Sequence, residues 1–399
     1  MGVTEVSHRS STFQQVVDDA EASLRQLLGI GDNFAILFTQ GGGTEQFSAT
    51  ALNLMARHAK TYPEYWNKQA AAAGSSTSRV RGPPADYAIS GSWSAKAFKE
   101  AARLSFNSHA AFDSRKDVPG SNGRFGAIPP VEQWRLSPTD DVPPAFLYYC
   151  DNETVDGVEF GAGSSPGGFP VESLPASYLE KVPLVADMSS NILSRRIPHL
   201  DKHALIFFGA QKNVGPSGVT IIIIRKDMIV DPDESTIRDA GGPLIPTTLV
   251  YKNLLDNKSM YNTPPMFSIY VSGLVFKDLL ENGGGVQGAE QRSAEKSKMV
   301  HDVLEQSEGL YVATVPQKDV RSRMNVTFRI CSTEGKQDDA LEAAFVKFCA
   351  KRGIMQVKGH RSVGGIRTSL YNAVTVEQTK KLVDAMLEFA KEVNAGSAK

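Results

Sequence analysis

Residues 207–228, FFGAQKNVGPSGVTIIIIRKDM, set two apolar runs on either side of a loop of small residues that carries one lysine, Lys212. Short apolar runs bounded by glycine and proline are typical of buried β-strands, so the stretch predicts strand, loop, strand. A lysine in such a loop loses hydration on both sides. Its amine can reach back to water, as in most isolated lysines, or it can serve in covalent chemistry. The rest of the sequence decides between these two interpretations.

The composition is that of a globular protein without a strong charge bias. Of 399 residues, 41% are hydrophobic and 22% are charged, so we expect a large core divided between two domains. Lys and Arg number 43 against 44 Asp and Glu, which argues against nucleic-acid and anionic-membrane partners. Three cysteines without paired spacing argue against disulfides and a metal site. With no signal-peptide core and no apolar run long enough for a membrane, we expect a cytoplasmic protein.

Apolar strands alternate with amphipathic helices over residues 1–283. The predicted strands include NFAILF (33–38), DYAIS (86–90), AFLYYC (145–150), VPLVADMSS (182–190) and HALIFFG (203–209). This alternation predicts an α/β fold, in which helices cover both faces of a mostly parallel sheet. From residue 284 to residue 399 the order of helical and strand-like segments changes, and this predicts a smaller C-terminal α+β domain. Segments 65–84 and 113–130, rich in Gly, Pro, Ser and charge, are predicted to be surface insertions outside the pocket.

Several residues match the needs of pyridoxal phosphate, a cofactor that binds covalently to a lysine amine. Asp187 ends an apolar strand and could pair with the ring nitrogen, or merely cap a loop. The turn LFTQGGGTEQFSA (37–49) brings glycines to a helix start, where phosphate could bind, although most glycine turns are only turns. Trp93, within ISGSWSAKA (89–97), could face the ring or belong to the core.

The sequence also gathers cations suited to an anionic substrate. GHRSVGGIR (359–367) holds His360, Arg361 and Arg367 within nine residues, and SHR near the start adds His8 and Arg9. Arginine presents a planar fork to carboxylates and phosphates, so this set predicts a substrate with more than one anionic group. Each arginine alone could also belong to a solvated basic face.

Together these residues resemble the phosphoserine aminotransferase family, a branch of the class V aminotransferases with the fold-type I architecture of pyridoxal-phosphate enzymes. The resembling segments, in family order over nearly the whole chain, are EVSHRS, QGGGTEQFSATALNL, YYCDNETVDG, ADMSSNILSRRI, GAQKNVGPSG, MYNTPPMFSIYVSGLVFK, SRMNVTF and GHRSVGGIRTSLYNAV. The family pattern usually starts with a further Asn-x-x-x-Gly-Pro segment before EVSHR, so the resemblance implies an N-terminus shorter than usual. Glu45 stands where the family commonly has glycine and places a negative charge beside the expected phosphate.

The resemblance implies a role for each matching residue. Lys212 would bind the cofactor and move the proton at the substrate Cα, while Asp187 would pair with the ring nitrogen. The other implied cofactor contacts are Trp93 on the ring, Thr154 on its hydroxyl, Gly43, Thr44 and Gln211 on the phosphate, and Asn262 and Thr263 from a second subunit. The implied substrate contacts are Arg367 on the α-carboxylate, and His8, Arg9, His360 and Arg361 on the distal phosphate or carboxylate. Sites shared in this way imply a homodimer.

The reaction that the resemblance implies is ping-pong transamination between L-glutamate and 3-phosphohydroxypyruvate, giving O-phospho-L-serine and 2-oxoglutarate in serine biosynthesis. A doubly anionic substrate agrees with the cation set. One alternative is a class V transaminase for alanine, serine or glyoxylate, which would not need the second set of cations. Another is a dimeric pseudo-enzyme that keeps the fold without the cofactor. Cysteine desulfurase is disfavoured, because no cysteine lies in an obvious mobile loop.

Overall fold

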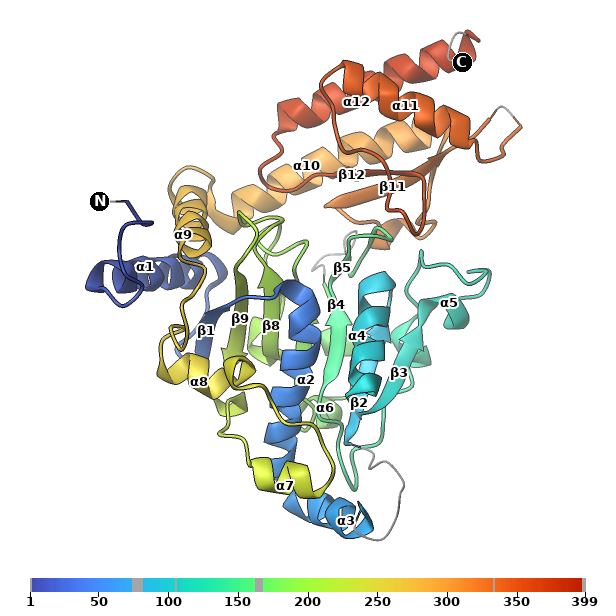
Figure 1. Cartoon of the computed structure of the whole chain (residues 1–399). Helices are drawn as coiled ribbons and strands as arrows, with labels where there is room; N and C mark the ends of the chain where they lie inside the picture. The colour runs from blue at the N-terminus through green and yellow to red at the C-terminus, as the bar shows by residue number, and fades with distance from the viewer. Residues whose placement is uncertain (1, 74–81, 105, 162–167, 333, 397–399) are drawn as a thin grey trace.

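The computed structural model describes residues 2–73, 82–104, 106–161, 168–332 and 334–396. The larger part is built on a seven-stranded sheet in the order β1-β9-β8-β7-β4-β2-β3 (Figure 1). Within this sheet β9 alone runs antiparallel to its neighbours. Its strands are β1 (Phe34–Thr39), β2 (Pro84–Ile89), β3 (Asn107–Asp113), β4 (Leu147–Cys150), β7 (Leu184–Asp187), β8 (His203–Gly209) and β9 (Thr220–Arg225). The predicted α/β fold with a mostly parallel sheet is confirmed.

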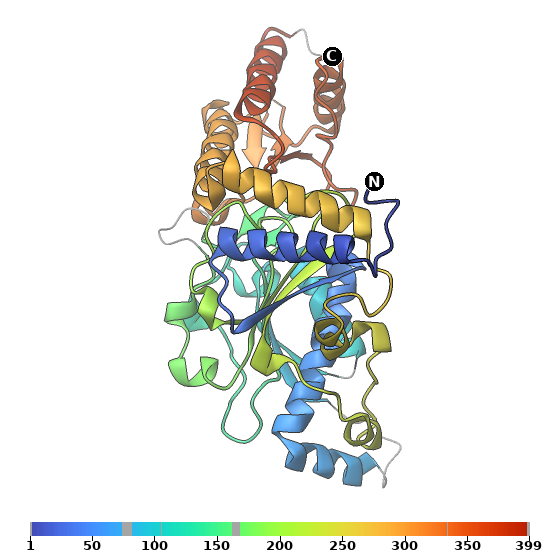
Figure 2. The same ribbon diagram turned by 90° about the vertical axis from the view of Figure 1, so that its left-hand side faces the viewer.

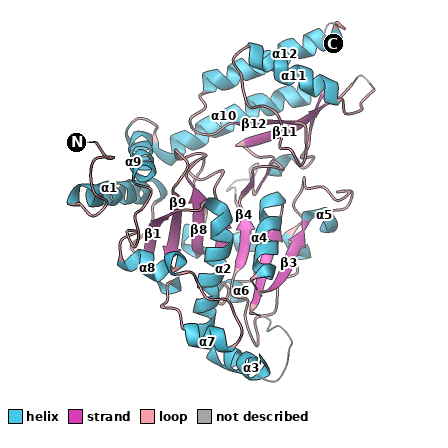
Figure 3. Cartoon of the chain, viewed as in Figure 1, coloured by secondary structure: helices cyan, strands magenta, loops and turns pink. Residues whose placement is uncertain are grey.

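Helices cover both faces of the sheet (Figure 3). Within β8, Ile206 and Phe208 pack into one core with α1, while Leu205 and Phe207 pack into the opposite core with α2 and α4. All four side chains are fully buried, which explains why the strand sequence is continuously apolar. The longer helices of this part are α1 (Ser11–Leu28), α2 (Gly42–Thr61), α3 (Pro63–Ala73), α4 (Ser92–Arg103) and α9 (Met266–Glu281), and the short ones are α5 (Ser114–Asp117), α6 (Ala176–Leu179), α7 (Glu234–Asp239) and α8 (Tyr251–Asp256).

The C-terminal part is a three-stranded antiparallel sheet with three helices on one side (Figure 1). It contains α10 (Gly285–Gln306), β10 (Tyr311–Ala313), β11 (Asn325–Ile330), α11 (Asp339–Lys351), β12 (Ile366–Ser369) and α12 (Val376–Asn394). Its own apolar cluster includes Val300, Phe328, Phe345 and Met386. A two-stranded hairpin of β5 (Asn152–Glu153) and β6 (Val158–Glu159) lies between the two sheets. Among the described residues, no helix is long and apolar enough to span a membrane.

Two predictions about surface insertions differ from the structure. Part of the first segment, 65–84, belongs to α3, and its Trp66 is only 1% exposed because the indole packs against and donates a hydrogen bond to His58. Residues 74–81 of that segment lie outside the described residues. The second segment, 113–130, folds back onto the C-terminal part, where the backbone N–H of Ile128 donates to Gln317. It therefore reaches the cleft described below, whereas the sequence predicted it to lie outside the pocket.

Candidate active site

The sequence-predicted cofactor residues follow the carboxyl ends of neighbouring parallel strands. Asp187 ends β7 and Lys212 follows β8, while Thr154 and Trp93 follow β4 and β2. In a parallel sheet these ends lie at one edge, where loops from several strands can meet around a ligand. The edge faces the C-terminal part of the chain (Figure 1).

Lys212 directs its amine into this group of residues. Its Nζ donates a hydrogen bond of 2.8 Å to Thr154 Oγ1 and lies 5.8 Å from the centre of the Trp93 ring. Burial lowers the pKa of Lys212, although the nearby Asp187 acts in the opposite direction. A lysine with a lowered pKa is more often neutral, and the neutral amine is the nucleophilic form. The loop lysine is therefore placed for covalent chemistry rather than extended into water.

Asp187 is a buried carboxylate with one weakly satisfied oxygen. Its Oδ1 accepts from the backbone N–H of Ser189 at 2.9 Å, whereas its Oδ2 accepts a long bond of 3.5 Å from the Tyr148 hydroxyl. Burial raises the pKa of Asp187. A Cβ added to Gly43 would lie 3.6 Å from that Oδ2 atom, so the start of α2 closely approaches the carboxylate. This oxygen can accept a hydrogen bond from a cationic ring nitrogen.

The turn before α2 offers backbone donors. Gly41 and Gly42 have φ values of 84° and 66°, which favour glycine, and α2 begins there without a side-chain cap. The backbone N–H of Gly42 donates to Thr220 Oγ1 at 2.8 Å. The N–H groups of Gly43 and Thr44, which follow in the first helical turn, suit a phosphate. The Glu45 side chain folds back against Gly41, where a Cβ would overlap it, and burial raises the Glu45 pKa. The carboxylate thus lies beside the first turn of α2.

Trp93 is held by residues that the sequence analysis did not identify. Glu153 is fully buried and accepts from the backbone N–H groups of Trp93 (2.7 Å) and Ser94 (2.9 Å). Asp156 accepts from the backbone N–H of Ser92 at 2.6 Å. Burial, followed by the charge of Asp156, raises the pKa of Glu153 to about 8. These carboxylates fix the start of α4 by accepting from its first backbone N–H groups, and no local sequence pattern signals a contact between segments about 60 residues apart.

The C-terminal part supplies the cations. A cavity of about 730 Å³ is lined by Arg367 and His360 and, from the other side, by Arg115, Asp156 and the segment 123–125. Arg367 lies on β12 opposite Thr327 of β11, and its Nε is buried without a hydrogen-bond partner among the described residues. Burial, then the charges of Arg367, Lys96 and Arg361, lowers the pKa of His360. Arg361 itself is exposed.

Other sequence-predicted residues are not brought to this group within one chain. His8 and Arg9 precede α1, and Asn262 and Thr263 lie in the exposed loop before α9. Both segments are at the side of the molecule shown in Figure 2, where α1 and α9 lie side by side. The Gln211 side chain folds back over Gly209, since a Cβ at Gly209 would lie 2.3 Å from its Oε1 atom.

Comparison with known proteins now identifies the family. The family model described as Aminotransferase class-V matches residues 150–382, a segment that contains Asp187, Lys212 and Arg367. The chain belongs to the class V aminotransferases. This aminotransferase is 43% identical to the phosphoserine aminotransferase of Drosophila melanogaster, over 98% of this chain and 90% of that relative. It is 41% identical to a putative phosphoserine aminotransferase of Schizosaccharomyces pombe, over the same shares of the two chains.

Solved structures show the same fold. The phosphoserine aminotransferase of Bacillus circulans subsp. alkalophilus superposes on this aminotransferase with a TM-score of 0.77 and 35% identity, covering 98% of this chain and 90% of that one. A PLP-bound phosphoserine aminotransferase from Trichomonas vaginalis gives a TM-score of 0.75 and 35% identity, covering 97% and 91%. The prediction of a class V aminotransferase of fold-type I is confirmed.

Proposed function

We propose that the chain is a pyridoxal-phosphate-dependent phosphoserine aminotransferase of serine biosynthesis. It would exchange the amino group between L-glutamate and 3-phosphohydroxypyruvate, with O-phospho-L-serine and 2-oxoglutarate as products. The observation that carries the proposal is the cleft that Arg367 and His360 of the C-terminal part line together with Val155 and Asp156. These two residues follow Thr154, whose hydroxyl bonds the amine of Lys212. Relatives up to 43% identical over nearly the whole chain carry this activity in their names.

The residues at the sheet edge fit pyridoxal phosphate. The Oδ2 atom of Asp187 accepts a long 3.5 Å bond from Tyr148 and can accept a shorter one from a ring N–H. Gly43 places no side chain in front of this oxygen, and the amides of Gly43 and Thr44 in the first turn of α2 suit the phosphate. Trp93 would cover one ring face and Thr154 would bond the ring hydroxyl. Gln211 would join Gly43 and Thr44 at the phosphate. Bound pyridoxal phosphate supplies an electron sink that makes the hydrogen on the substrate Cα acidic.

Lys212 would hold the cofactor and then carry the proton at Cα. Burial favours the neutral amine that this role requires. The 2.8 Å bond to Thr154 and the position above Trp93 orient the amine toward the centre of the site. Asp187, fixed by Ser189, would keep the opposite end of the ring protonated, because a buried carboxylate is stabilised by a neighbouring cation.

The substrate would be held through its anionic groups. Arg367 would bind the α-carboxylate with its planar fork, and His360 and Arg361 would bind the distal phosphate or carboxylate. Since L-glutamate and 3-phosphohydroxypyruvate both carry two anionic groups, one set of cations would serve both half-reactions. His8 and Arg9 would complete the distal site from a second subunit.

A homodimer accounts for the residues that one chain does not bring to its own site. The outward face of α9 carries Phe267, Tyr270 and Leu274, which are 57%, 37% and 47% exposed. These side chains recur at helical spacing, and an apolar stripe of this kind is typical of a subunit interface. The stripe lies beside the N-terminal segment that holds His8 and Arg9 and close to Asn262 and Thr263 in the sequence, so contact here would carry these residues toward a partner.

Two further predictions complete the proposal. Residues 1–283 would act as the large cofactor-binding domain and residues 284–399 as the small domain. The cytoplasm would be the compartment, and this is supported by Cys150, Cys331 and Cys349, which are all free and buried.

The test is the visible absorbance of purified protein loaded with pyridoxal phosphate. We expect the band of the loaded protein to disappear on addition of L-glutamate and to return with 3-phosphohydroxypyruvate. Return of the band with pyruvate or glyoxylate, and not with the phosphorylated acid, would identify a transaminase for small substrates instead. If no band forms with the cofactor, the chain is a pseudo-enzyme and the proposal is wrong.

A further inference from the structure

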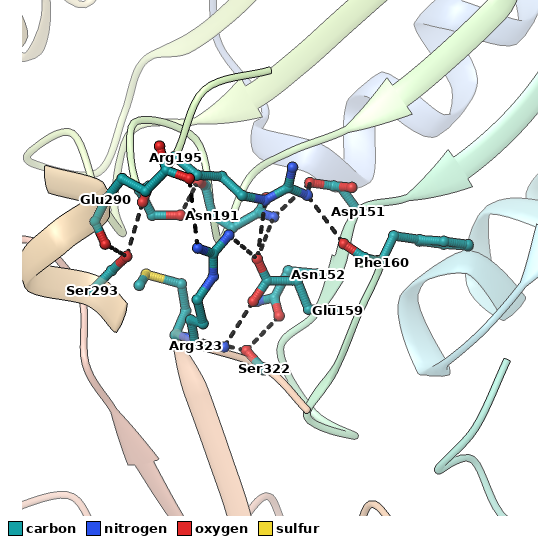
Figure 4. A network of polar contacts seen from close by, with 12 residues as sticks. Asp151, Asn152, Glu159, Phe160, Asn191, Arg195, Glu290, Ser293, Ser322 and Arg323 are labelled. Carbon is teal, nitrogen blue, oxygen red and sulfur yellow. Dashed lines mark hydrogen bonds and ion pairs between the residues drawn. The ribbon is translucent and has the colours of Figure 1, made fainter. Parts of the chain in front are cut away.

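The hairpin of residues 151–160, which includes β5 and β6, contacts both parts of the molecule. On its large-domain side it carries Thr154, which bonds Lys212, and Glu153, which holds Trp93. On its other side it meets the residues that lead into β11. Figure 4 shows this second set of contacts, in which Glu159 lies between the guanidinium groups of Arg195 and Arg323.

Glu159 holds the entry to β11 directly. Its side chain is fully buried, and its Oε2 accepts a 2.7 Å bond from the backbone N–H of Arg323. The other oxygen, Oε1, lies 3.5 Å from the Arg323 guanidinium and 3.3 Å from Nε of Arg195. Arg195 in turn forms a 2.6 Å ion pair with Asp151 at the start of the hairpin. The Glu159 carboxylate therefore connects the large domain to the segment that leads into β11.

Ser322 adds uncharged contacts at the same place. Its hydroxyl donates to Asn152 Oδ1 at 2.6 Å, and its backbone N–H donates to the Gly157 carbonyl at 2.9 Å. Asn152 also donates to Asn325 Oδ1 at 2.9 Å. These bonds cross between the hairpin and β11 without using any residue assigned to the cofactor or the substrate.

The same strand carries the partner of Arg367. Thr327 of β11 is paired with Arg367 of β12, and the Thr327 hydroxyl donates to the Asp156 carbonyl of the hairpin at 3.2 Å. Contacts thus connect Glu159 through Arg323 and β11 to Arg367. The same hairpin carries Thr154, which bonds the amine of Lys212.

We propose that Glu159 is a positioning residue that sets where Arg367 binds the substrate carboxylate relative to Lys212. The inference rests on the proposed function, because that function assigns the carboxylate to Arg367. Glu159 touches neither substrate nor cofactor in this scheme. It acts by holding the start of β11 against the hairpin that carries Thr154.

Removing the Glu159 charge leaves Arg323 with only its longer 3.9 Å ion pair to Glu290, which is 40% exposed, so we expect the entry to β11 to shift toward that partner and toward water. Displacing the Arg367 fork weakens its charge-assisted hydrogen bonds to a carboxylate, and the loss of one such bond lowers affinity by about 10- to 100-fold. Both substrates use the same arginine. Glu159→Gln should therefore raise the KM values of L-glutamate and 3-phosphohydroxypyruvate together, by roughly 10- to 100-fold, with a smaller change in kcat.

The experiment measures substrate KM and kcat, and also the dissociation constant of glutarate, an unreactive dicarboxylate, from the cofactor-loaded protein. We call the contacts of Glu159 and Asn152 with Ser322 and Arg323 the hairpin–β11 joint. Ser322→Ala removes an uncharged bond of this joint and should raise the KM values and the glutarate dissociation constant by about 3- to 10-fold. Asp86→Asn is the matched control. Asp86 is an equally buried carboxylate that bonds Tyr178 and Ser137 within the large domain, so this variant should lower thermal stability without changing KM.

The outcomes separate this inference from the proposed function. Activity of the parent protein with the two substrates tests the proposed function alone. The ratio of the glutarate dissociation constants of variant and parent tests the positioning role alone. Weaker glutarate binding in Ser322→Ala and Glu159→Gln, but not in Asp86→Asn, supports the positioning role. If Glu159→Gln does not fold, Ser322→Ala decides. Unchanged glutarate binding in the folded joint variants, or no glutarate binding by the parent protein, overturns the inference.

Discussion

A buried histidine gives a sharp prediction for acid stability. His58 is 1% exposed, and its Nδ1 receives the indole N–H of Trp66 at 3.1 Å while its Nε2 lies 3.1 Å from the Pro143 carbonyl. An indole only donates and a carbonyl only accepts, so these partners fix the neutral tautomer with hydrogen on Nε2. A proton on Nδ1 would face the Trp66 N–H. Burial accordingly lowers the pKa of His58 from 6.5 to about 4.

The sign and size of the effect follow from this difference. The unfolded chain takes up a proton near pH 6.5 and the folded chain only near pH 4, so stability is lost as pH falls through that interval. At 1.36 kcal/mol per pH unit, the loss is about 2 kcal/mol at pH 5 and about 3.4 kcal/mol below pH 4. His203, bonded to the Tyr149 hydroxyl, has its pKa lowered to about 4 by burial and should add a similar loss.

The perturbation is His58→Gln, which keeps one donor and one acceptor but does not titrate. The free energy of unfolding is measured by urea titration at pH 7.5 and pH 5, at one protein concentration. The parent protein should lose about 2 kcal/mol more than the variant between these two pH values. His109→Gln, which removes a ring that is 42% exposed, is the control. Equal losses in the parent and His58→Gln would refute the argument.

The remaining predictions concern the site and the proposed dimer. Lys212→Ala should lower transamination by roughly 1,000-fold or more while the circular dichroism spectrum is retained, and full activity in this variant would remove Lys212 from the mechanism. Gly91→Ala should lower the free energy of unfolding by about 1–3 kcal/mol, because the new Cβ would lie 2.3 Å from Glu153, whereas Gly215→Ala, where a Cβ comes no closer than 3.8 Å to its nearest neighbours and the backbone is not left-handed, is the control. Leu274→Glu should shift sedimentation from dimer to monomer, and an unchanged dimer would place the interface elsewhere.

The sheet, and the edge at which Asp187 and Lys212 lie, were predictable because they depend on local patterns. HALIFFG coincides with β8, and its continuous apolarity reflects burial on both faces of a central strand. The positions of Lys212 and Asp187 then followed from the general rule that ligands bind at the carboxyl ends of parallel strands. These features need only a few neighbouring residues to be recognised.

The supports of the site were not predictable in the same way. Glu153 fixes Trp93 across a gap of 60 residues in the sequence, and no local periodicity reports a contact of that kind. The α3 helix was missed because its apolar anchor, Trp66, was grouped with a polar neighbourhood, although the indole packs onto His58. Segment 113–130 looks like any surface loop until its bond from Ile128 to Gln317 is known.

The two central charges of the site illustrate how burial connects stability to function. Burial raises the pKa of Asp187 and lowers that of Lys212, so the fold disfavours the charged form of each group. The charge of each group partly offsets the desolvation penalty of the other, but no hydrogen bond among the described residues joins them. A cationic ring nitrogen beside Asp187 would stabilise its carboxylate, while a neutral Lys212 amine is the form that reacts. In the proposed function, the desolvation that destabilises the free chain would therefore also favour a cationic cofactor and the reactive form of the lysine.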